Sequence, residues 1–116
     1  STHEWLYFIR HLPEEMHRQQ MEKLDQAFNF TNSGNSEILT AWFINAIRNA
    51  YEPAYESLET FLVEVGRRKF LMPLYGEMVK TEHGKEMALE IYTKARPNYH
   101  FVSVNSIDAM LDYKEN

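Results

Sequence analysis

Apolar side chains recur at intervals of three and four residues along nearly the whole chain, and this spacing indicates amphipathic helices. The first set comprises Trp5, Phe8, Ile9 and Leu12. Runs of β-branched residues, which favour strands, are few, and only four glycines and four prolines occur among the 116 residues. The pattern therefore predicts an all-α fold, because no segment requires a strand.

About seven helices are expected, with prolines, glycines and polar turn residues at their limits. They span residues 2–12, 14–28, 36–50, 53–65, 71–80, 85–95 and 103–113. Pro13 and Pro73 lie where first helical turns would be, and Gly66 is expected to end the fourth helix in the left-handed conformation. Residues 81–84 are expected to separate the last two of the longer helices. The third helix is apolar on almost every side, so we expect it to lie in the middle of the domain.

The first, third and fifth of these helices begin near residues 2, 36 and 71, at nearly equal intervals. Equal spacing of helix pairs is typical of stacked antiparallel hairpins. The sequence therefore predicts a two-layer α-α superhelix of the HEAT or armadillo kind. Its length suits a single domain, residues 1–116, around one core.

Composition excludes several classes of function. The chain has no cysteine, so it cannot form disulfides, a zinc ribbon or a catalytic thiolate. A formal net charge of -5 provides no general attraction to phosphate backbones, and no run approaches the ~18 apolar residues that a membrane span needs. We therefore expect neither nucleic acid nor a membrane as a partner.

Motifs for catalysis within the chain are also missing. A zinc peptidase helix reads His-Glu-x-x-His, but His3-Glu4 is followed by Trp-Leu-Tyr, and no two histidines are four residues apart. There is no Gly-x-Ser-x-Gly elbow for a serine nucleophile and no phosphate-binding loop. Neighbouring carboxylates such as Glu14 and Glu15 are typical of a solvated helix face. No catalytic residue and no metal ligand is therefore expected in this chain.

One charged cluster stands out, because Arg67, Arg68 and Lys69 are adjacent in an otherwise acidic chain. Two interpretations are open. Cations that follow a helix can interact with the negative end of its dipole. Alternatively, an Arg and a second cation two residues later can bind one carboxylate where the backbone is extended. Gly66 and Pro73 would then hold the segment in a defined path.

Several motifs make the sequence similar to one family, the C-terminal domains of leukotriene A-4 hydrolase and related zinc aminopeptidases. The resemblance covers nearly the whole chain in order and spacing. It rests on Asn35-Ser36-Glu37-Ile38 with Trp42, Gly66-Arg67-Arg68-Lys69-Phe70, Pro73-Leu74, Tyr92 and Ala109-Met110-Leu111. It implies that the chain is the helical C-terminal domain of a larger, multidomain metallopeptidase.

The resemblance also implies where the chemistry lies. The zinc ligands, the general-base Glu and the site for the substrate amine belong to upstream domains, so the isolated chain is expected to bind no cofactor and to be inactive. The C-terminal domain closes the substrate cleft, and Arg67 and Lys69 bind the carboxylate of a short peptide or of the lipid epoxide substrate. Arg68 is expected to be an ordinary surface residue. Aminopeptidase is the implied activity, since epoxide hydrolysis is a specialised trait within the family.

Two other functions compete with this one. The chain could be a freestanding helical-repeat module that binds an acidic peptide or a chain terminus through Arg67 and Lys69. It could instead be an oligomerisation domain, which requires a large self-complementary apolar surface. If the chain is instead the C-terminal domain of a metallopeptidase, its partners are the upstream catalytic domain and a short peptide substrate. The expected location is the cytoplasm, with export to the periplasm as the alternative.

Overall fold

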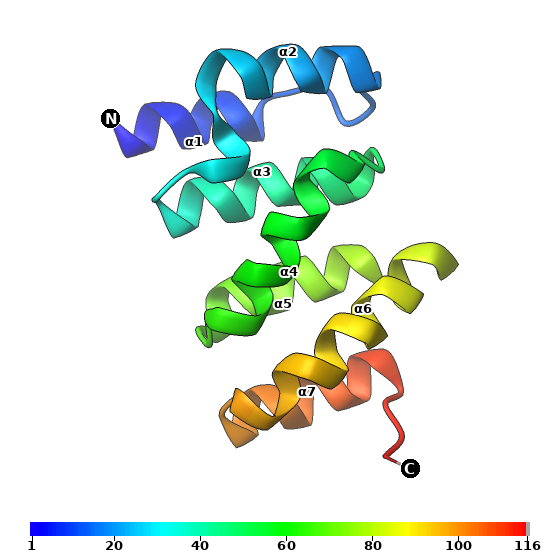
Figure 1. Cartoon of the computed structure of the whole chain (residues 1–116). Coiled ribbons are helices and arrows are strands. Elements are labelled where there is room, and N and C mark those ends of the chain that lie inside the picture. Colours follow the sequence, from blue (N-terminus) through cyan, green and yellow to red (C-terminus); the bar gives the residue numbers. More distant parts are fainter. Residues whose placement is uncertain (116) are drawn as a thin grey trace. The chain divides into compact units, whose positions relative to one another are not determined.

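The computed structural model describes residues 1–115, and all regular structure in that range is helical (Figure 1). Seven α-helices and three short 3-10 helices occur there, and no strand does. The helices are α1 Thr2–Arg10, α2 Arg18–Phe28, η1 Phe30–Asn32, α3 Ser36–Arg48, η2 Glu52–Ala54, α4 Tyr55–Glu64, α5 Arg68–Met78, α6 Glu82–Ala95, η3 Arg96–Asn98 and α7 Phe101–Leu111. The prediction of an all-α fold with about seven helices is confirmed.

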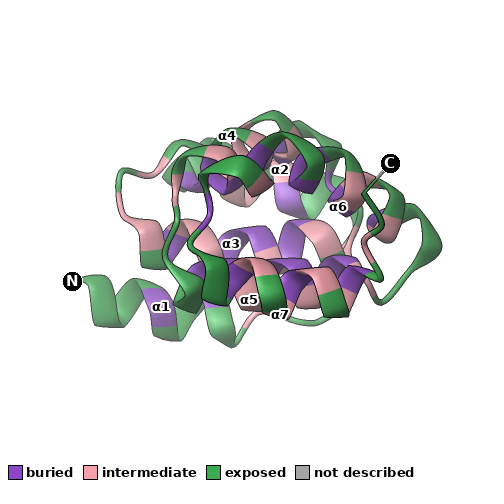
Figure 2. Ribbon diagram, turned by 90° about the horizontal axis from the view of Figure 1, so that it is seen from below, coloured by how far each residue is buried: buried purple, intermediate pink, exposed green. Residues whose placement is uncertain are grey.

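The chain divides into two compact units, Ser1–Ser57 and the residues from Leu58 onward. In the first unit α1 packs beside α3, and α2 lies in the opposite layer (Figure 2). In the second unit α5 and α7 share a layer, and α6 lies in the other (Figure 2). Each unit therefore has the two-layer arrangement expected of helical hairpins.

The first unit is built around Trp42, which is completely buried in α3. Its indole Nε1 donates to Oγ1 of Thr31 at 2.9 Å, and that hydroxyl donates to the carboxylate of Asp25 at 2.6 Å. The hydroxyl of Tyr51 donates to the same carboxylate at 2.9 Å. Burial and this hydrogen bond raise the pKa of Tyr51 to about 12. The buried residues of α3 are Ile38, Trp42, Phe43, Asn45 and Ala46, so this helix contributes much of the interior of the first unit.

Three tyrosines lie among the buried residues of the second unit. The rings of Tyr75, Tyr92 and Tyr99 lie within 6.4 Å of one another, and the hydroxyls of Tyr75 and Tyr99 are 3.0 Å apart. The hydroxyl of Tyr99 also donates to the carbonyl oxygen of Leu62 in α4. Burial raises the pKa of Tyr99 to about 12. These hydrogen bonds allow the phenols of Tyr75 and Tyr99 to pack where apolar residues are usual.

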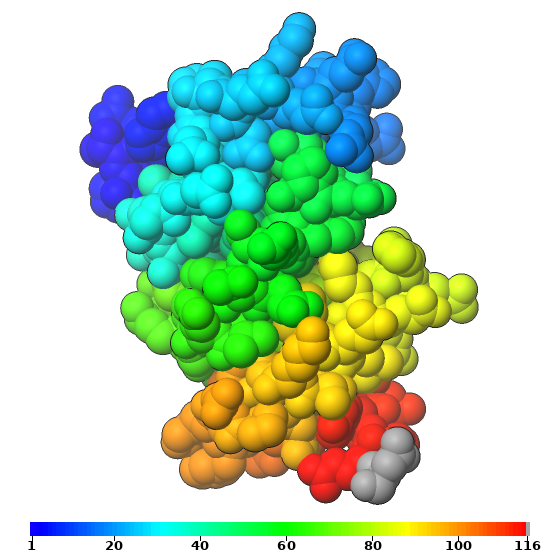
Figure 3. All heavy atoms as spheres, in the orientation of Figure 1, coloured from blue at the N-terminus to red at the C-terminus, as the bar shows by residue number. Residues whose placement is uncertain are grey.

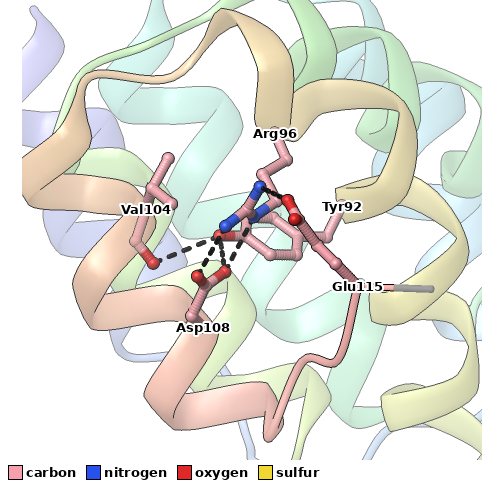
Figure 4. Close-up of polar contacts among 5 residues, drawn as sticks. All are labelled: Tyr92, Arg96, Val104, Asp108 and Glu115. Atoms are coloured by element: carbon pink, nitrogen blue, oxygen red, sulfur yellow. Dashed lines mark hydrogen bonds and ion pairs between the residues drawn. The ribbon is translucent and has the colours of Figure 1, made fainter.

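An ion pair joins the end of α6 to α7 (Figure 4). Nε and Nη2 of Arg96 donate to the two oxygens of Asp108 at 2.9 and 2.8 Å, and the hydroxyl of Tyr92 donates to Asp108 at 2.5 Å. Nη1 of Arg96 also bonds Glu115, and its guanidinium lies 4.9 Å from the ring centroid of Tyr113. The network fixes the segment after α7 against α6, so we assign it a structural role.

Several predicted helix limits are wrong. The second helix begins at Arg18 rather than residue 14, because the amide of Met16 donates to Oδ1 of Asn49 at 2.8 Å and holds that segment outside the helix. Gly66 does not adopt the left-handed conformation. Asn29 and Asp112 do so instead, with φ of 54° and 51°, at the ends of α2 and α7. Asn and Asp tolerate this conformation because their short polar side chains form local hydrogen bonds.

The fifth and sixth helices also begin earlier than expected. α5 begins at Arg68 and includes Pro73, and α6 begins at Glu82 and includes Gly84. Phe70 and Leu71 are buried, so packing recruits the turn ahead of the proline into the helix. The break between the two helices therefore lies earlier than residues 81–84, because α5 ends at Met78 and Thr81 is already the N-cap of α6, where it accepts from the amide of Gly84 at 3.0 Å.

Candidate functional site

The three adjacent cations lie at the N-terminus of α5. Arg67 is the N-cap residue, and Arg68 and Lys69 form the beginning of the first turn. The positive end of a helix dipole points to this end, so positive side chains here are unfavourable for helix stability. The interpretation that the cations stabilise the C-terminus of the preceding helix stays open, because they also follow α4, which ends at Glu64. Their placement concentrates positive charge at one exposed point of the second unit.

Arg67 and Lys69 converge on one aromatic ring. Cζ of Arg67 lies 5.4 Å and Nζ of Lys69 lies 5.2 Å from the ring centroid of Phe70. Both cations are exposed, while only 5% of Phe70 is exposed, and its ring lies 6.0 Å from that of Phe61. A cation held against an aromatic face gains about 0.5–1 kcal/mol at exposed sites. Both residues that the sequence predicts as a carboxylate site therefore lie near the ring of Phe70.

The backbone at this point differs from the sequence-based expectation. Arg67 is extended, with φ -74° and ψ 119°, but Lys69 is helical. The Arg67 carbonyl accepts from the amides of Phe70 and Leu71. The Arg67 side chain has only hydrogen-bond donors, so it cannot cap the amides of the first turn as Ser or Asp would. The N-terminal amides of a helix and a nearby guanidinium are both groups that can bind an anion.

Arg68 differs from its two neighbours, because its Nη1 donates to Oγ of Ser106 at 2.8 Å. This hydrogen bond connects the start of α5 to α7. The expectation that Arg68 is an ordinary surface residue is thus refined, since it is exposed but linked to a second helix. It provides a natural control for experiments on Arg67 and Lys69.

Phe70 is the residue of this site that sequence reasoning missed. In the sequence it stands only as the last residue of the Gly-Arg-x-Lys-Phe pattern. Its spacing from Arg67 is three residues, and residues three apart meet on one side of a helix. That spacing would have predicted the contact if the helix had been expected to begin at Arg68 rather than at residue 71.

The first unit contains a polar hollow of about 410 Å³ that the sequence did not indicate. Its walls come from α2, η1 and the start of η2, and they include Glu22, Asp25 and Tyr51. Asp25 already accepts hydrogen bonds from Thr31 and Tyr51. We therefore regard its carboxylate as part of the scaffold.

Neither metal-binding groups nor membrane helices emerge from the described residues. Within residues 1–115, no three or more histidine or acidic side chains are grouped so that they could hold a metal ion. No helix in the same range is long and apolar enough to cross a membrane.

Comparisons with known proteins give a consistent result. A family model described as "Leukotriene A4 hydrolase, C-terminal" matches residues 1–111. The chain is 29% identical over 111 residues to leucine aminopeptidase 2 of Neurospora crassa, a match that covers 96% of the chain and 16% of that protein. It is 28% identical over 83 residues to leukotriene A-4 hydrolase of Xenopus laevis, covering 72% of the chain and 14% of the relative. It is 22% identical over 119 residues to aminopeptidase B of Mus musculus, covering 99% of the chain and 18% of the relative. The chain thus spans less than a fifth of the length of each of these relatives.

Proposed function

This chain belongs to the leukotriene A4 hydrolase C-terminal family, and we propose that it is the helical C-terminal domain of a cytoplasmic zinc aminopeptidase. In this proposal the zinc and the catalytic residues belong to the upstream part of the same polypeptide. The domain closes one side of the substrate cleft and binds the carboxylate of a short peptide through Arg67 and Lys69. The aminopeptidase names of two of the relatives support the activity.

The observation that carries the proposal is the convergence of Arg67 and Lys69 on Phe70 at the start of α5. A guanidinium offers paired donors that match a carboxylate, and Lys69 adds a second positive charge. Because Phe70 is buried, the ring that both cations face is fixed to the domain core. A carboxylate at this point would be held in a defined position.

A fixed cation can select substrates by length. A short peptide has its free amine at one end and its carboxylate at the other, so an enzyme that binds both ends places one peptide bond at the metal. Correct alignment of reacting groups lowers the activation barrier in addition to improving affinity. The proposed role of the domain is therefore positioning of the substrate, while the upstream part supplies the bond cleavage.

Kinetics of Arg67→Ala in the full-length enzyme test the proposal. A hydrogen bond to a charged group contributes about 1.5–3 kcal/mol, and about 1.4 kcal/mol corresponds to tenfold. We expect kcat/KM for a tripeptide to fall at least ~10-fold in Arg67→Ala, and less in Lys69→Ala. For the same tripeptide with a C-terminal amide, kcat/KM should fall only slightly in either variant.

Arg68→Ala is the matched control, because it removes a neighbouring cation that bonds Ser106 instead. It should leave the preference for the free carboxylate unchanged. Unchanged kinetics of Arg67→Ala toward the free tripeptide, with zinc content and folding intact, would contradict the carboxylate assignment.

A further inference from the structure

Three partly exposed aromatic side chains lie together in the first unit. Trp5 and Phe8 come from α1, and Phe28 is the last residue of α2. The Trp5 ring centroid is 6.2 Å from that of Phe8 and 5.0 Å from that of Phe28, and the Phe8 and Phe28 centroids are 5.9 Å apart. Their exposed fractions are 37%, 39% and 45%. We call Trp5, Phe8 and Phe28 the aromatic patch.

Packing within the first unit covers only part of the patch, in which the rings of Trp5, Phe8 and Phe28 lie 5.6, 6.4 and 5.4 Å from the buried ring of Phe30. The sequence pattern placed Trp5 and Phe8 on the inward side of the first helix. In the structure the buried residues of α1 are Leu6 and Ile9, at 4% and 1% exposure. Trp5 and Phe8 instead remain accessible, so their large apolar surfaces are available to another surface.

A hollow of about 280 Å³ adjoins the patch. Trp5, Phe28, Phe30 and Ile38 provide its apolar walls, and Asn29, Asn32 and Ser33 provide polar groups. In Figure 3 the dark blue atoms of α1 lie beside the lighter blue atoms of the segment near residue 30 on the same exposed face. An apolar centre with polar groups around it, and a tryptophan within it, is the usual anatomy of a protein interface.

The family assignment indicates what covers this surface. The matched region is the C-terminal part of its family, and it makes up only 14–18% of the relatives described above. Because the region is described as C-terminal, most of the polypeptide of such proteins precedes it in sequence. Covalent connection gives that upstream part a high effective concentration at nearby surfaces. The patch lies within the first three turns of α1 and at the end of α2.

We propose that the aromatic patch is the surface through which this domain docks on the catalytic part of its own polypeptide. This inference rests on the proposed function, because that function requires an upstream catalytic part. The docking partner presents an apolar surface with an inserted side chain for the hollow and hydrogen-bonding groups for Asn29, Asn32 and Ser33.

Hydroxyl-radical footprinting of the full-length polypeptide tests the inference. Tyr7 is the internal control, because it lies on the same helix, stacks on His11 and is 67% exposed. If the patch is docked, we expect Trp5 to be labelled at least fivefold less than Tyr7, with Phe8 and Phe28 also protected. This protection should not change across a 50-fold range of protein concentration.

Two results would overturn the inference. Labelling of Trp5 at about half the level of Tyr7, as their exposed fractions of 37% and 67% predict, would show that the patch is uncovered. Protection that grows with protein concentration would assign the patch to self-association. Neither result depends on substrate binding, whereas the carboxylate assignment is tested by the kinetics of Arg67→Ala. Failure of one proposal can therefore be told from failure of the other.

Discussion

Single residues in this chain are fixed by partners that are distant in the sequence. The carboxylate of Asp108 receives two hydrogen bonds from Arg96 and one from Tyr92, which precede it by 12 and 16 residues. Hydrogen bonds from Arg96, with a further one from Tyr92, hold the pKa of Asp108 below its ordinary value. Asp108 therefore links the stability of the second unit to pH.

The sign of this link follows from the lowered pKa. Asp108 is easier to protonate in the unfolded chain, where its pKa is near 3.8, than in the folded chain. Its contribution to the free energy of unfolding is therefore present above the unfolded pKa and is lost as pH falls through the lower, folded pKa. We expect Asp108→Asn to lower the urea midpoint at pH 6. The curves of the variant and the parent should converge near pH 2.

Asp112→Asn is the control for this experiment. Asp112 pairs with Lys114, but their side chains are 74% and 79% exposed, and exposed pairs contribute little. Its urea midpoint should follow that of the parent at every pH. A difference between Asp108→Asn and the parent that stays constant from pH 6 to pH 2 would refute the link to Asp108.

The candidate site could be predicted in its residues but not in its geometry. Arg67 and Lys69 follow from the resemblance to a family, and the structure places both around Phe70. The helical conformation of Lys69 was not predicted, because Pro73 indicated a later helix start. The bonds of Asp25 and Asp108 were also missed, since spacing along a chain does not indicate which distant groups will meet.

At the scale of elements, the junction between α5 and α6 depends on a close approach that only glycine allows. A Cβ on Gly84 would lie 2.2 Å from the carbonyl oxygen of Met78 and 2.9 Å from Oγ1 of Thr81. Met78 is the last residue of α5, and Thr81 is the N-cap of α6. The first turn of α6 therefore packs directly on the end of α5.

A pair of glycine substitutions tests this close approach. Gly84→Ala must displace backbone, and we expect it to lower the free energy of unfolding by about 1–3 kcal/mol. Gly76→Ala is the matched control, because Gly76 lies inside α5 and a Cβ there meets nothing within 4 Å. It should raise stability by about 0.5–1 kcal/mol through helix propensity. Urea denaturation measures both, and equal effects of the two substitutions would contradict the packing described.

The existence and number of the helices could be predicted from apolar spacing, but their limits could not. From the local sequence alone, Pro73 and Gly84 predict interruptions of the helices. That prediction fails because Phe70 and Leu71 are buried and because Gly84 lies against the end of α5 at Met78. Local signals fail at these places because the packing of neighbouring helices contributes more to stability than a single residue's preference.

At the scale of the whole molecule, net charge and local charge point in opposite directions. Residues 1–64 carry 10 acidic and 4 basic side chains, and residues 65–116 carry 7 and 8. The formal net charge of -5 would disfavour an anionic ligand. The cluster at the start of α5 nevertheless favours one, because exposed charges interact over about 8–10 Å at physiological salt. Local arrangement therefore decides which ligand the chain can bind.

The division of work between this domain and the upstream part can be tested on the 116-residue chain by itself. A catalytic zinc site needs three protein ligands, and residues 1–115 contain no group of three or more suitable side chains. Metal analysis after incubation with zinc should therefore find much less than one equivalent per chain. Peptidase assays with tripeptides should show no turnover above the uncatalysed rate.

The full-length polypeptide is the comparison, and it should bind one zinc and hydrolyse the same peptides. Circular dichroism of the isolated chain should show the helix content described above, so that a negative result is not due to unfolding. One equivalent of zinc in the folded, isolated chain would place metal ligands in this domain and contradict the proposed division. Turnover by the isolated chain without zinc would place a catalytic group in this domain and would equally contradict the proposed division.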